Sequence, residues 1–372
     1  MKIYVDMYLA KNLGDDLFLY ILSHKFPEIE FTVNYYGDDY GEVFSEYANV
    51  IKPNYTVFNK ILNRVHIYDY INDADRISKK YDALLFLGGS IFREEYYWRE
   101  EYEKRYRLVE AFNKKNKSIW ILGANFGPVK TKKFIEDYGR LFENCTDVCF
   151  RDKYSFNLFR KIENIRYAPD IVYCLQDFLK LKRKNIKREI AISVIEPNHV
   201  EGLDRYRENY INFLINIIEQ YLKQGYKCNL FSFCEKEGDL KICKEIKNNI
   251  KEGEVDIYSY CGNIKEIIEV MLESEVVIAS RFHANVISIM FGKKLLPVVY
   301  SEKTSNILKD IGINKKIISI DGMGQVESKN VEEFYIDTNN LKLLKDTINN
   351  ADLQFKVMRK CIKDAEKNIV YN

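Results

Sequence analysis

Short apolar runs alternate with amphipathic stretches along the whole chain, and this rhythm predicts its elements. The runs that predict strands lie at 2–8, 29–35, 83–88, 118–123 and 147–151 in the first half, and at 189–195, 227–234, 254–260, 275–280, 294–300 and 316–320 in the second. Between them, apolar residues recur at three- and four-residue spacing, most clearly over 206–224, which predicts a helix that ends before Gly225. Strands that are apolar throughout and alternate with helices favour parallel sheets covered on both faces.

The two series of strands are separated by a basic run, LKLKRKNIKRE at 179–189, which we interpret as a solvated linker. With 372 residues, the chain is also longer than one domain of ordinary size. We therefore expect an α/β protein with two Rossmann-like doubly wound domains, residues 1–180 and 181–340. The stretch 341–372 predicts one or two helices, which are candidates for completing the first domain.

Composition narrows the class of protein without naming a chemistry. The chain is 47% hydrophobic and 30% charged, which is typical of a globular protein with a large core. Its formal net charge is only +2, so no overall field attracts nucleic acid, and we expect no nucleic-acid partner. The eight cysteines contain no CxxC pair, and the closest two, Cys145 and Cys149, favour buried reduced thiols over a zinc site. There is no run of about 18 apolar residues and no signal-peptide pattern, so we expect a cytoplasmic protein without a membrane-spanning segment.

Polar residues and glycines gather directly after five of the predicted strands. In chain order they are Asn12, Gly14 and Asp15; Gly88, Gly89 and Ser90; Gly123, Asn125 and Gly127; Arg151 and Asp152; and Ser280, Arg281 and His283. In open parallel sheets, ligands bind beyond the carboxyl ends of the strands. One glycine alone is a weak signal, because glycines often end strands. The repetition at five strand ends indicates a binding edge of bare backbone and polar side chains.

The stretch SRFH at 280–283 has the most specific chemistry. Ser280 is a good N-cap for a helix that starts at Arg281, and the first-turn amides of that helix favour an anion. Arg281 adds a planar fork for a carboxylate or phosphate, and His283 follows on the same turn. Lys303, just after a predicted strand that ends at Tyr300, would complete a cationic pocket. The alternatives are a structural ion pair for Arg281, a buried structural role for His283 and a surface position for Lys303.

Common enzyme motifs are missing from the chain. It has no GxGxxG after a strand and no GxxxxGK[ST], HExxH or GxSxG. Residues 93–107, REEYYWREEYEKRYR, are crowded with charges that nearly cancel and with aromatic residues. They predict a solvated helix with Tyr and Trp on its inner face, and a surface that binds an acceptor substrate is the alternative.

Taken in order, these segments resemble the polysaccharide pyruvyl transferase family. The residues that carry the resemblance are Asn12, Gly14 and Asp15; Gly88 and Gly89; Gly123, Gly127 and Pro128; Arg151, Asp152 and Ser155; Pro169 and Asp170; Ser280, Arg281, Phe282 and His283; Pro297; and Tyr300 with Lys303. Three positions depart from the family pattern. Ser90 stands where a third glycine is common, Ser280 directly precedes Arg281 where one residue often intervenes, and Phe282 replaces a leucine.

The resemblance implies two Rossmann-like domains that face a cleft, as in GT-B glycosyltransferases. It also implies transfer of the pyruvyl group of phosphoenolpyruvate to a sugar diol of a polysaccharide or its precursor, forming a pyruvate ketal and releasing phosphate. His283 would transfer protons and Asp15 would orient or deprotonate the acceptor. Arg281, Arg151, Lys303 and Ser280 would bind the donor, while Asn12, Gly14, Gly88, Gly89, Ser90, Asn125 and Asp152 would line the acceptor or cleft loops.

No metal-binding cluster is visible in the sequence, so we expect no obligatory metal, and no cofactor apart from phosphoenolpyruvate as co-substrate. The first domain would bind the acceptor and the second the donor. A lipid-linked acceptor would bring the protein to the inner face of the membrane, whereas the oligomeric state is left open. Two alternatives on the same scaffold are a glycosyltransferase that uses a nucleotide-sugar donor and a non-catalytic glycan-binding protein.

Overall fold

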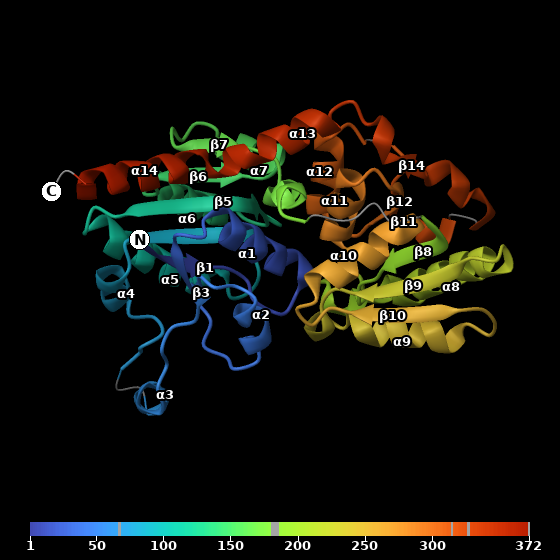
Figure 1. The fold of residues 1–372 in the computed structure, drawn as a ribbon, viewed down its shortest axis with the longest axis horizontal. Coiled ribbons are helices and arrows are strands. Elements are labelled where there is room, and N and C mark those ends of the chain that lie inside the picture. Colours follow the sequence, from blue (N-terminus) through green and yellow to red (C-terminus); the bar gives the residue numbers. More distant parts are fainter. Residues whose placement is uncertain (66–67, 180–185, 314, 326–327, 371–372) are drawn as a thin grey trace. The chain divides into compact units, whose positions relative to one another are not determined.

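The computed structural model describes the chain apart from residues 66–67, 180–185, 314, 326–327 and 371–372 (Figure 1). It divides into two compact units. Unit 1 comprises Met1–Leu9, Phe18–Ile171 and Asn350–Asn372, and unit 2 comprises Ala10–Leu17 and Val172–Asn349. Most of the basic run interpreted as a linker, residues 180–185, lies outside the described residues.

Unit 1 is built on a seven-stranded parallel sheet with the strand order β3-β2-β1-β4-β5-β6-β7. The strands are β1 (Lys2–Asp6), β2 (Glu30–Val33), β3 (Val50–Ile51), β4 (Ala83–Phe92), β5 (Ser118–Phe126), β6 (Asp147–Phe150) and β7 (Ile165–Tyr167). The helices are α1 (Leu13–Lys25), whose first turn belongs to unit 2, α2 (Gly41–Ser45), α3 (Val57–Arg64), α4 (Ala74–Lys80), α5 (Trp98–Asn113), α6 (Lys132–Glu143), α7 (Lys153–Phe159) and α14 (Lys356–Val370).

Unit 2 repeats this plan with the strand order β10-β9-β8-β11-β12-β13, and β14 pairs antiparallel with β12. Its strands are β8 (Lys187–Ser193), β9 (Lys227–Ser232), β10 (Val255–Ser259), β11 (Ser274–Ala279), β12 (Lys294–Val299), β13 (Ile318–Ser319) and β14 (Ile336–Asp337). Its helices are α8 (Arg207–Lys223), α9 (Asp239–Asn249), α10 (Ile264–Glu273), α11 (Phe282–Met290), α12 (Glu302–Asp310) and α13 (Leu344–Ala351), whose last two residues belong to unit 1.

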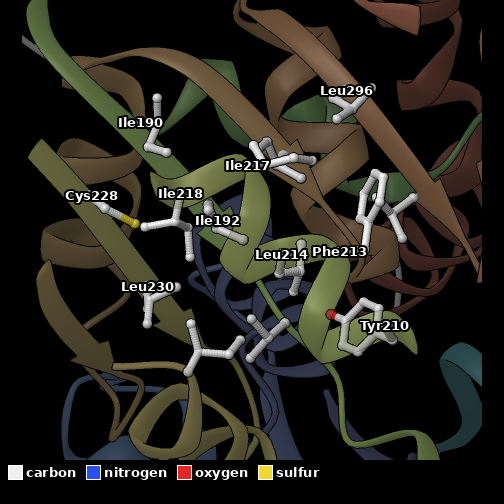
Figure 2. Packing of buried hydrophobic residues seen from close by; sticks show 14 of the residues in the cluster. Ile190, Ile192, Tyr210, Phe213, Leu214, Ile217, Ile218, Cys228, Leu230 and Leu296 are labelled. Atoms are coloured by element: carbon white, nitrogen blue, oxygen red, sulfur yellow. The ribbon is translucent and has the colours of Figure 1, made fainter. Parts of the chain in front are cut away.

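The core of unit 2 explains why its strands are apolar on both faces. On one face, Ile190 and Ile192 of β8 pack against Leu214 and Ile218 of α8 (Figure 2). On the other face, α10 and α11 contact β11. Each unit therefore has the doubly wound arrangement expected for parallel strands covered by helices on both sides, and the predicted fold class, two Rossmann-like doubly wound domains, is confirmed.

The charged and aromatic segment at 93–107 becomes helix α5, but the helix begins at Trp98, because β4 continues to Phe92. Trp98 and Tyr102 lie buried on the inner face of the helix, as the sequence predicts. Arg105 is also buried, which the pattern did not indicate. Its burial places a guanidinium group inside unit 1.

Two further expectations concern cysteines and membrane segments. Cys145 and Cys149 are buried free thiols, and burial raises the pKa of Cys149 to about 12.

Within the described part of the chain, no helix combines the length and the apolar character that crossing a bilayer requires.

The two sheets share a feature that positions ligands. In each, the strand order reverses at one point, between β1 and β4 in unit 1 and between β8 and β11 in unit 2. Loops that follow strands on either side of such a point diverge and leave a crevice at the carboxyl edge, where ligands of doubly wound folds bind.

Candidate active site

Four segments meet at the carboxyl edge of the unit 2 sheet: residues 10–16, 237–239, 280–283 and 300–303. The backbone N–H of Leu13 donates to the carbonyl oxygen of Phe233, 3.0 Å away, just after β9. The Asn12 amide lies 3.5 Å from Oε1 of Glu237. The residues predicted from the first strand end therefore join the residues predicted from the β11 end within one unit.

His283 and Gly14 are in direct contact. A Cβ atom on Gly14 would lie 1.8 Å from Nδ1 of His283, so the imidazole occupies the space that any side chain at position 14 would need. The Asn12 side chain fixes this turn, because its Oδ1 accepts a hydrogen bond of 3.0 Å from the N–H of Gly14. His283 is only 8% exposed, on the first turn of α11. The predicted Asn12, Gly14 and His283 thus form one locally built cluster.

The two acidic residues after Gly14 differ in environment. Asp16 is fully buried and accepts a hydrogen bond of 2.7 Å from the Tyr260 hydroxyl, which fits a structural role. Asp15 is half-buried at the start of α1, and its charge helps to raise the pKa of Tyr300. Asp15 is therefore the carboxylate of this pair that lies within electrostatic reach of the pocket.

The guanidinium group of Arg281 is bound by two carboxylates. Its Nε donates to Oδ2 of Asp239 at 2.8 Å, its Nη2 donates to Oδ1 of the same residue, and its Nη1 donates to Glu237. Asp239 is fully buried and also accepts the N–H groups of Phe233 and Cys234 at 3.0 Å each. In this structure the fork of Arg281 therefore has the ion-pair arrangement that the sequence analysis gave as its alternative role.

The expected start of the helix after β11 is wrong by one residue. The N-cap of α11 is Arg281, and the helix begins at Phe282. The hydroxyl of Ser280 does not cap it, because this hydroxyl lies 2.9 Å from that of Tyr210 within the unit 2 core. The N–H groups of Ser280 and Arg281 instead donate to Oγ of Ser193 at 3.1 and 3.2 Å. Ser280 thus fixes the end of β11.

The pocket around these residues has mixed charge. Burial acts to raise the pKa of Glu237, but Arg281 and, more weakly, Lys303 lower it below its ordinary value. The pKa of Tyr300 is raised, first by burial and then by Glu237, Asp239 and Asp15, against the opposing effect of Arg281. Lys303 therefore lies within electrostatic reach of the Arg281 cluster. The pocket was expected to be purely cationic, but it contains both acidic and basic side chains.

A second polar cluster lies in unit 1, at the carboxyl ends of β4, β5 and β6. Arg151 is 2% exposed, and its Nη1 donates to Asp170 at 2.9 Å while its Nη2 donates to Oδ1 of Asn125 at 2.6 Å. The hydroxyl of Ser90 donates to the same Asn125 oxygen at 3.0 Å. The predicted Ser90, Asn125 and Arg151 are therefore joined through Asn125. Their convergence with Arg281 on one anion stays a prediction.

The remaining predicted residues of unit 1 have local structural contacts. Asp152 caps α7, since its carboxylate accepts the N–H of Ser155 at 2.8 Å and the hydroxyl of Ser155 at 2.9 Å. Gly88 and Gly89 have φ angles of 67° and 63°, which favour glycine. A Cβ atom on Gly88 would lie 2.5 Å from the Phe18 ring, so this turn also requires a bare backbone.

Glu237 and Asp239 belong to the unit 2 site but were not predicted. They lie in EKEGD at 235–239, directly after the apolar run that ends β9. The sequence contains the same signal here as at the other segments, which is a group of polar residues with a glycine directly after a strand. What the sequence does not contain is the pairing of these acids with Arg281 across 42 and 44 positions of the chain.

The fold and the two strand-end clusters define an α/β protein of two doubly wound units, in each of which polar loops gather at the carboxyl edge of the sheet. The family model for polysaccharide pyruvyl transferase matches residues 12–302, and the chain belongs to this family. It is accordingly a transferase, as the sequence motifs indicate. The match covers all four segments of the unit 2 site except residues 10–11 and 303.

Solved structures agree with the fold. UDP-GlcNAc 2-epimerase of Methanocaldococcus jannaschii, in complex with UDP-GlcNAc and UDP, is 10% identical, with a TM-score of 0.59 over 98% of this chain and 100% of that one. The S. aureus MnaA–UDP structure is 11% identical, with a TM-score of 0.59 over 96% and 97%. Anabaena HepE with UDP and glucose is 10% identical, with a TM-score of 0.55 over 98% and 100%. At this identity the likeness concerns the fold alone.

Proposed function

We propose that the protein transfers the pyruvyl group of phosphoenolpyruvate to two hydroxyls of a polysaccharide or its precursor and releases phosphate. The observation that carries this proposal is the contact of His283 with Gly14, the residue before Asp15, in a chain of the pyruvyl transferase family. Lys303 acts electrostatically on Glu237 of the same site. The proposal includes no cofactor and no metal. Chelation with EDTA should therefore leave turnover unchanged.

The reaction needs an acid before it needs a base. Protonation of the methylene carbon of phosphoenolpyruvate turns the adjacent carbon into an oxocarbenium-like centre. One sugar hydroxyl adds to this carbon and loses its proton, and a second hydroxyl then displaces phosphate and loses its proton in turn. The products are a cyclic ketal with a new methyl group and inorganic phosphate, so atoms and charge balance.

His283 is the proposed proton donor to the methylene carbon. An imidazole titrates near neutral pH and so both gives and accepts protons there. Gly14 and the Asn12 turn hold the ring in place on the first turn of α11. Asp15 is the proposed group that receives or orients the hydroxyl protons, because it is the half-buried acid of the same segment.

The donor has a phosphate and a carboxylate, and the proposed partners are Lys303, the N–H groups of the α11 first turn, and Arg281. Since Arg281 already binds Glu237 and Asp239, a donor anion would have to take the place of Glu237 on Nη1, leaving Asp239 paired. Glu237 is the natural group to exchange, because 29% of its side chain is exposed whereas that of Asp239 is 0% exposed.

The alternative is a glycosyltransferase with a nucleotide-sugar donor, a reading compatible with the fold. The donor substrate that the protein uses distinguishes pyruvyl transfer from glycosyl transfer. We expect the purified protein to release phosphate from phosphoenolpyruvate with a polysaccharide acceptor, and the product to show a new ketal methyl signal by NMR. Release of nucleotide from UDP-sugars, with no phosphate from phosphoenolpyruvate across an acceptor panel, would overturn the proposal in favour of the alternative.

A further inference from the structure

Unit 1 contains a cavity of about 320 Å³ that none of the residues proposed for catalysis lines. It lies where the strand order reverses, because its wall includes Asp6 at the end of β1 and Ser90 in β4. Its volume is at the small end of the range for ligand sites. A single sugar ring, rather than a long oligosaccharide, suits this size.

Two charged side chains, those of Arg105 and Asp6, lie close together in the wall of the cavity. Arg105 is 8% exposed, and its Nη1 donates to the carbonyl oxygen of Ile91 at 2.6 Å. Its Nε lies 3.7 Å from Oδ2 of Asp6, too far for a hydrogen bond, and meets no acceptor among the described residues. Arg105 and Asp6 therefore bring a charged donor and a charged acceptor to the wall of the cavity.

The same cavity offers acceptors beside this donor. The Asp6 carboxylate faces Arg105, and Glu101 lies 4.0 Å from Nη2 of the same guanidinium. Burial raises the pKa of Asp6, against the opposing effect of Arg105. The carboxylate oxygens accept hydrogen bonds and the guanidinium N–H groups donate them. Side by side, they match a ligand with neighbouring hydroxyl groups, because each hydroxyl both donates and accepts.

Aromatic side chains line the cavity. Trp98 is 8% exposed, while Tyr97 and Tyr8 are 37% and 40% exposed. Rings of this kind pack against the C–H faces of a pyranose, which are apolar. The charged residues favour a neutral ligand, because Arg93, Lys104 and Arg105 each lie within ion-pair distance of an acid: Glu95 at 3.1 Å, Glu100 at 2.8 Å and Asp6 at 3.7 Å.

We propose that this cavity binds one neutral pyranose ring, and that this ring is a residue of the acceptor glycan. The second half of the statement rests on the proposed function, whereas the first does not. Ser90 connects the cavity with the Asn125–Arg151 cluster. Its hydroxyl stands where the family commonly has a glycine, so this wall differs from the family pattern at the proposed sugar site.

The test compares two neighbouring tyrosines. Tyr97 lines the cavity, whereas Tyr96 is 98% exposed and does not. Saturation-transfer NMR with a panel of neutral methyl pyranosides should reveal a ligand of the wild-type protein, and Tyr97→Ala should weaken its binding at least about tenfold while Tyr96→Ala does not. Glu101→Gln should weaken it as well, and melting temperatures of all variants show that they are folded.

Turnover separates this inference from the proposed function. If the protein releases phosphate from phosphoenolpyruvate, Tyr97→Ala should raise the KM for the acceptor and leave the KM for phosphoenolpyruvate unchanged. If phosphate release fails altogether, the binding experiment still stands alone. The inference is overturned if no pyranoside of the panel binds the wild-type protein, or if the Tyr97 and Tyr96 variants bind equally well.

A second, independent observation concerns helix α3 (Val57–Arg64), none of whose residues is buried. Val57, Phe58, Ile61 and the following Val65 are 73%, 67%, 54% and 53% exposed. Their spacing places them on one side of the helix. Figure 1 shows α3 projecting from unit 1, away from the sheet.

We infer that α3 docks on an anionic lipid surface. The helix has two exposed basic residues, Lys60 and Arg64, and no acidic one. Lys60 lies 3.8 Å from the carboxylate of Asp38, which precedes the helix in the chain, so Arg64 provides most of the uncompensated charge. An apolar side flanked by basic residues is typical of helices that lie in the membrane interface, and a single two-turn helix gives weak, reversible binding. Charge complementarity selects the lipid surface over an apolar protein groove.

Cosedimentation with vesicles tests this assignment. The wild-type protein should bind vesicles that contain phosphatidylglycerol more strongly than vesicles of phosphatidylcholine alone, and Phe58→Glu should abolish the binding. Leu343→Glu, at an exposed leucine of unit 2, is the control and should bind as the wild type does. The assignment is overturned if neither vesicle binds, or if Phe58→Glu instead converts a dimer to a monomer in ultracentrifugation.

Discussion

Gly14 is the residue whose identity the structure explains most directly. In the sequence it is one glycine among several at strand ends, and only the family resemblance indicates a role for it. The geometry supplies the reason, since the His283 imidazole fills the space where a Cβ atom would stand. Pairs of this kind cannot be read from one sequence, because 268 residues separate the two positions and no local pattern links them.

Gly14→Ala should therefore disable the enzyme without unfolding it. The methyl group would force the imidazole from its position, and misplacing a catalytic group by about 1 Å costs about 10²-fold in rate. Gly41→Ala is the matched control, because a Cβ atom there meets nothing within 4 Å. Phosphate release and the melting temperature should be measured for both. Equal rates in the two variants would contradict the role of the contact.

His283→Asn tests proton transfer itself. Asparagine keeps much of the shape and some hydrogen bonding, but it transfers no proton near neutral pH. Turnover at saturating phosphoenolpyruvate should fall roughly 10²–10⁴-fold, with donor binding nearly unchanged. His24→Asn, at an exposed histidine of α1, should be neutral. A variant with lost stability and a nearly normal rate would assign His283 a structural role and direct attention to Asp15.

Glu237 should leave a signature in the pH dependence of stability. Because Arg281 and Lys303 hold its pKa below the ordinary value of 4.5 despite burial, the charged form stabilises the folded state. This stabilisation is complete above the ordinary pKa and is lost as the pH falls through the folded-state pKa. The free energy of unfolding of the wild type should therefore exceed that of Glu237→Gln by about 1–3 kcal/mol at pH 7. This difference should shrink below about pH 4.5. Urea unfolding measures it, and exposed Glu235→Gln should show no such difference.

At the scale of elements, hydrophobic periodicity located the strands that lie deep in the sheets. Helix α8, for example, occupies Arg207–Lys223, within the predicted 206–224. The strands that were missed, β3, β7 and β14, have only two or three residues, too few to show a period. Strands β4 and β5 run past Gly88 and Gly123, where glycine was expected to end them. Both glycines have positive φ angles, so they bend the strands without ending them.

The C-terminal segment provides a test at this scale. Gln354 is fully buried in unit 1, where its Oε1 accepts from the N–H of Gly123 at 2.9 Å and its Nε2 donates to the carbonyl oxygen of Ala168 at 2.8 Å. Gln354→Ala leaves the N–H of Gly123 and the carbonyl oxygen of Ala168 without this partner. The loss of each hydrogen bond should lower the free energy of unfolding by about 1–3 kcal/mol. Leu353→Ala, at the exposed neighbouring residue, should have little effect. Urea unfolding compares them, and equal stabilities would show that the segment is not anchored by this side chain.

At the scale of the whole molecule, the repeated series of strands predicted the two doubly wound units, because parallel strands must be covered on both faces wherever they occur. The pattern did not reveal that residues 10–17 belong to unit 2. Periodicity reports that a segment is buried, whereas membership of a unit depends on contacts such as that of Leu13 with Phe233, which are distant in sequence. The unit 2 site therefore combines loops from both ends of the family match.

Donor binding should stabilise the protein selectively. A ligand that binds only the folded state adds RT ln(1 + [L]/Kd) to its stability, about 2.7 kcal/mol at one hundred times the Kd. Phosphoenolpyruvate should accordingly raise the melting temperature by several degrees in a concentration-dependent way, whereas UDP-GlcNAc should not. Lys303→Ala removes one of the proposed cations from a half-buried position, so it should weaken the shift that phosphoenolpyruvate produces. Lys309→Ala, on the same helix α12, is the control. A shift with UDP-GlcNAc alone would assign the donor pocket to a nucleotide sugar, and an unchanged shift in Lys303→Ala would remove Lys303 from it.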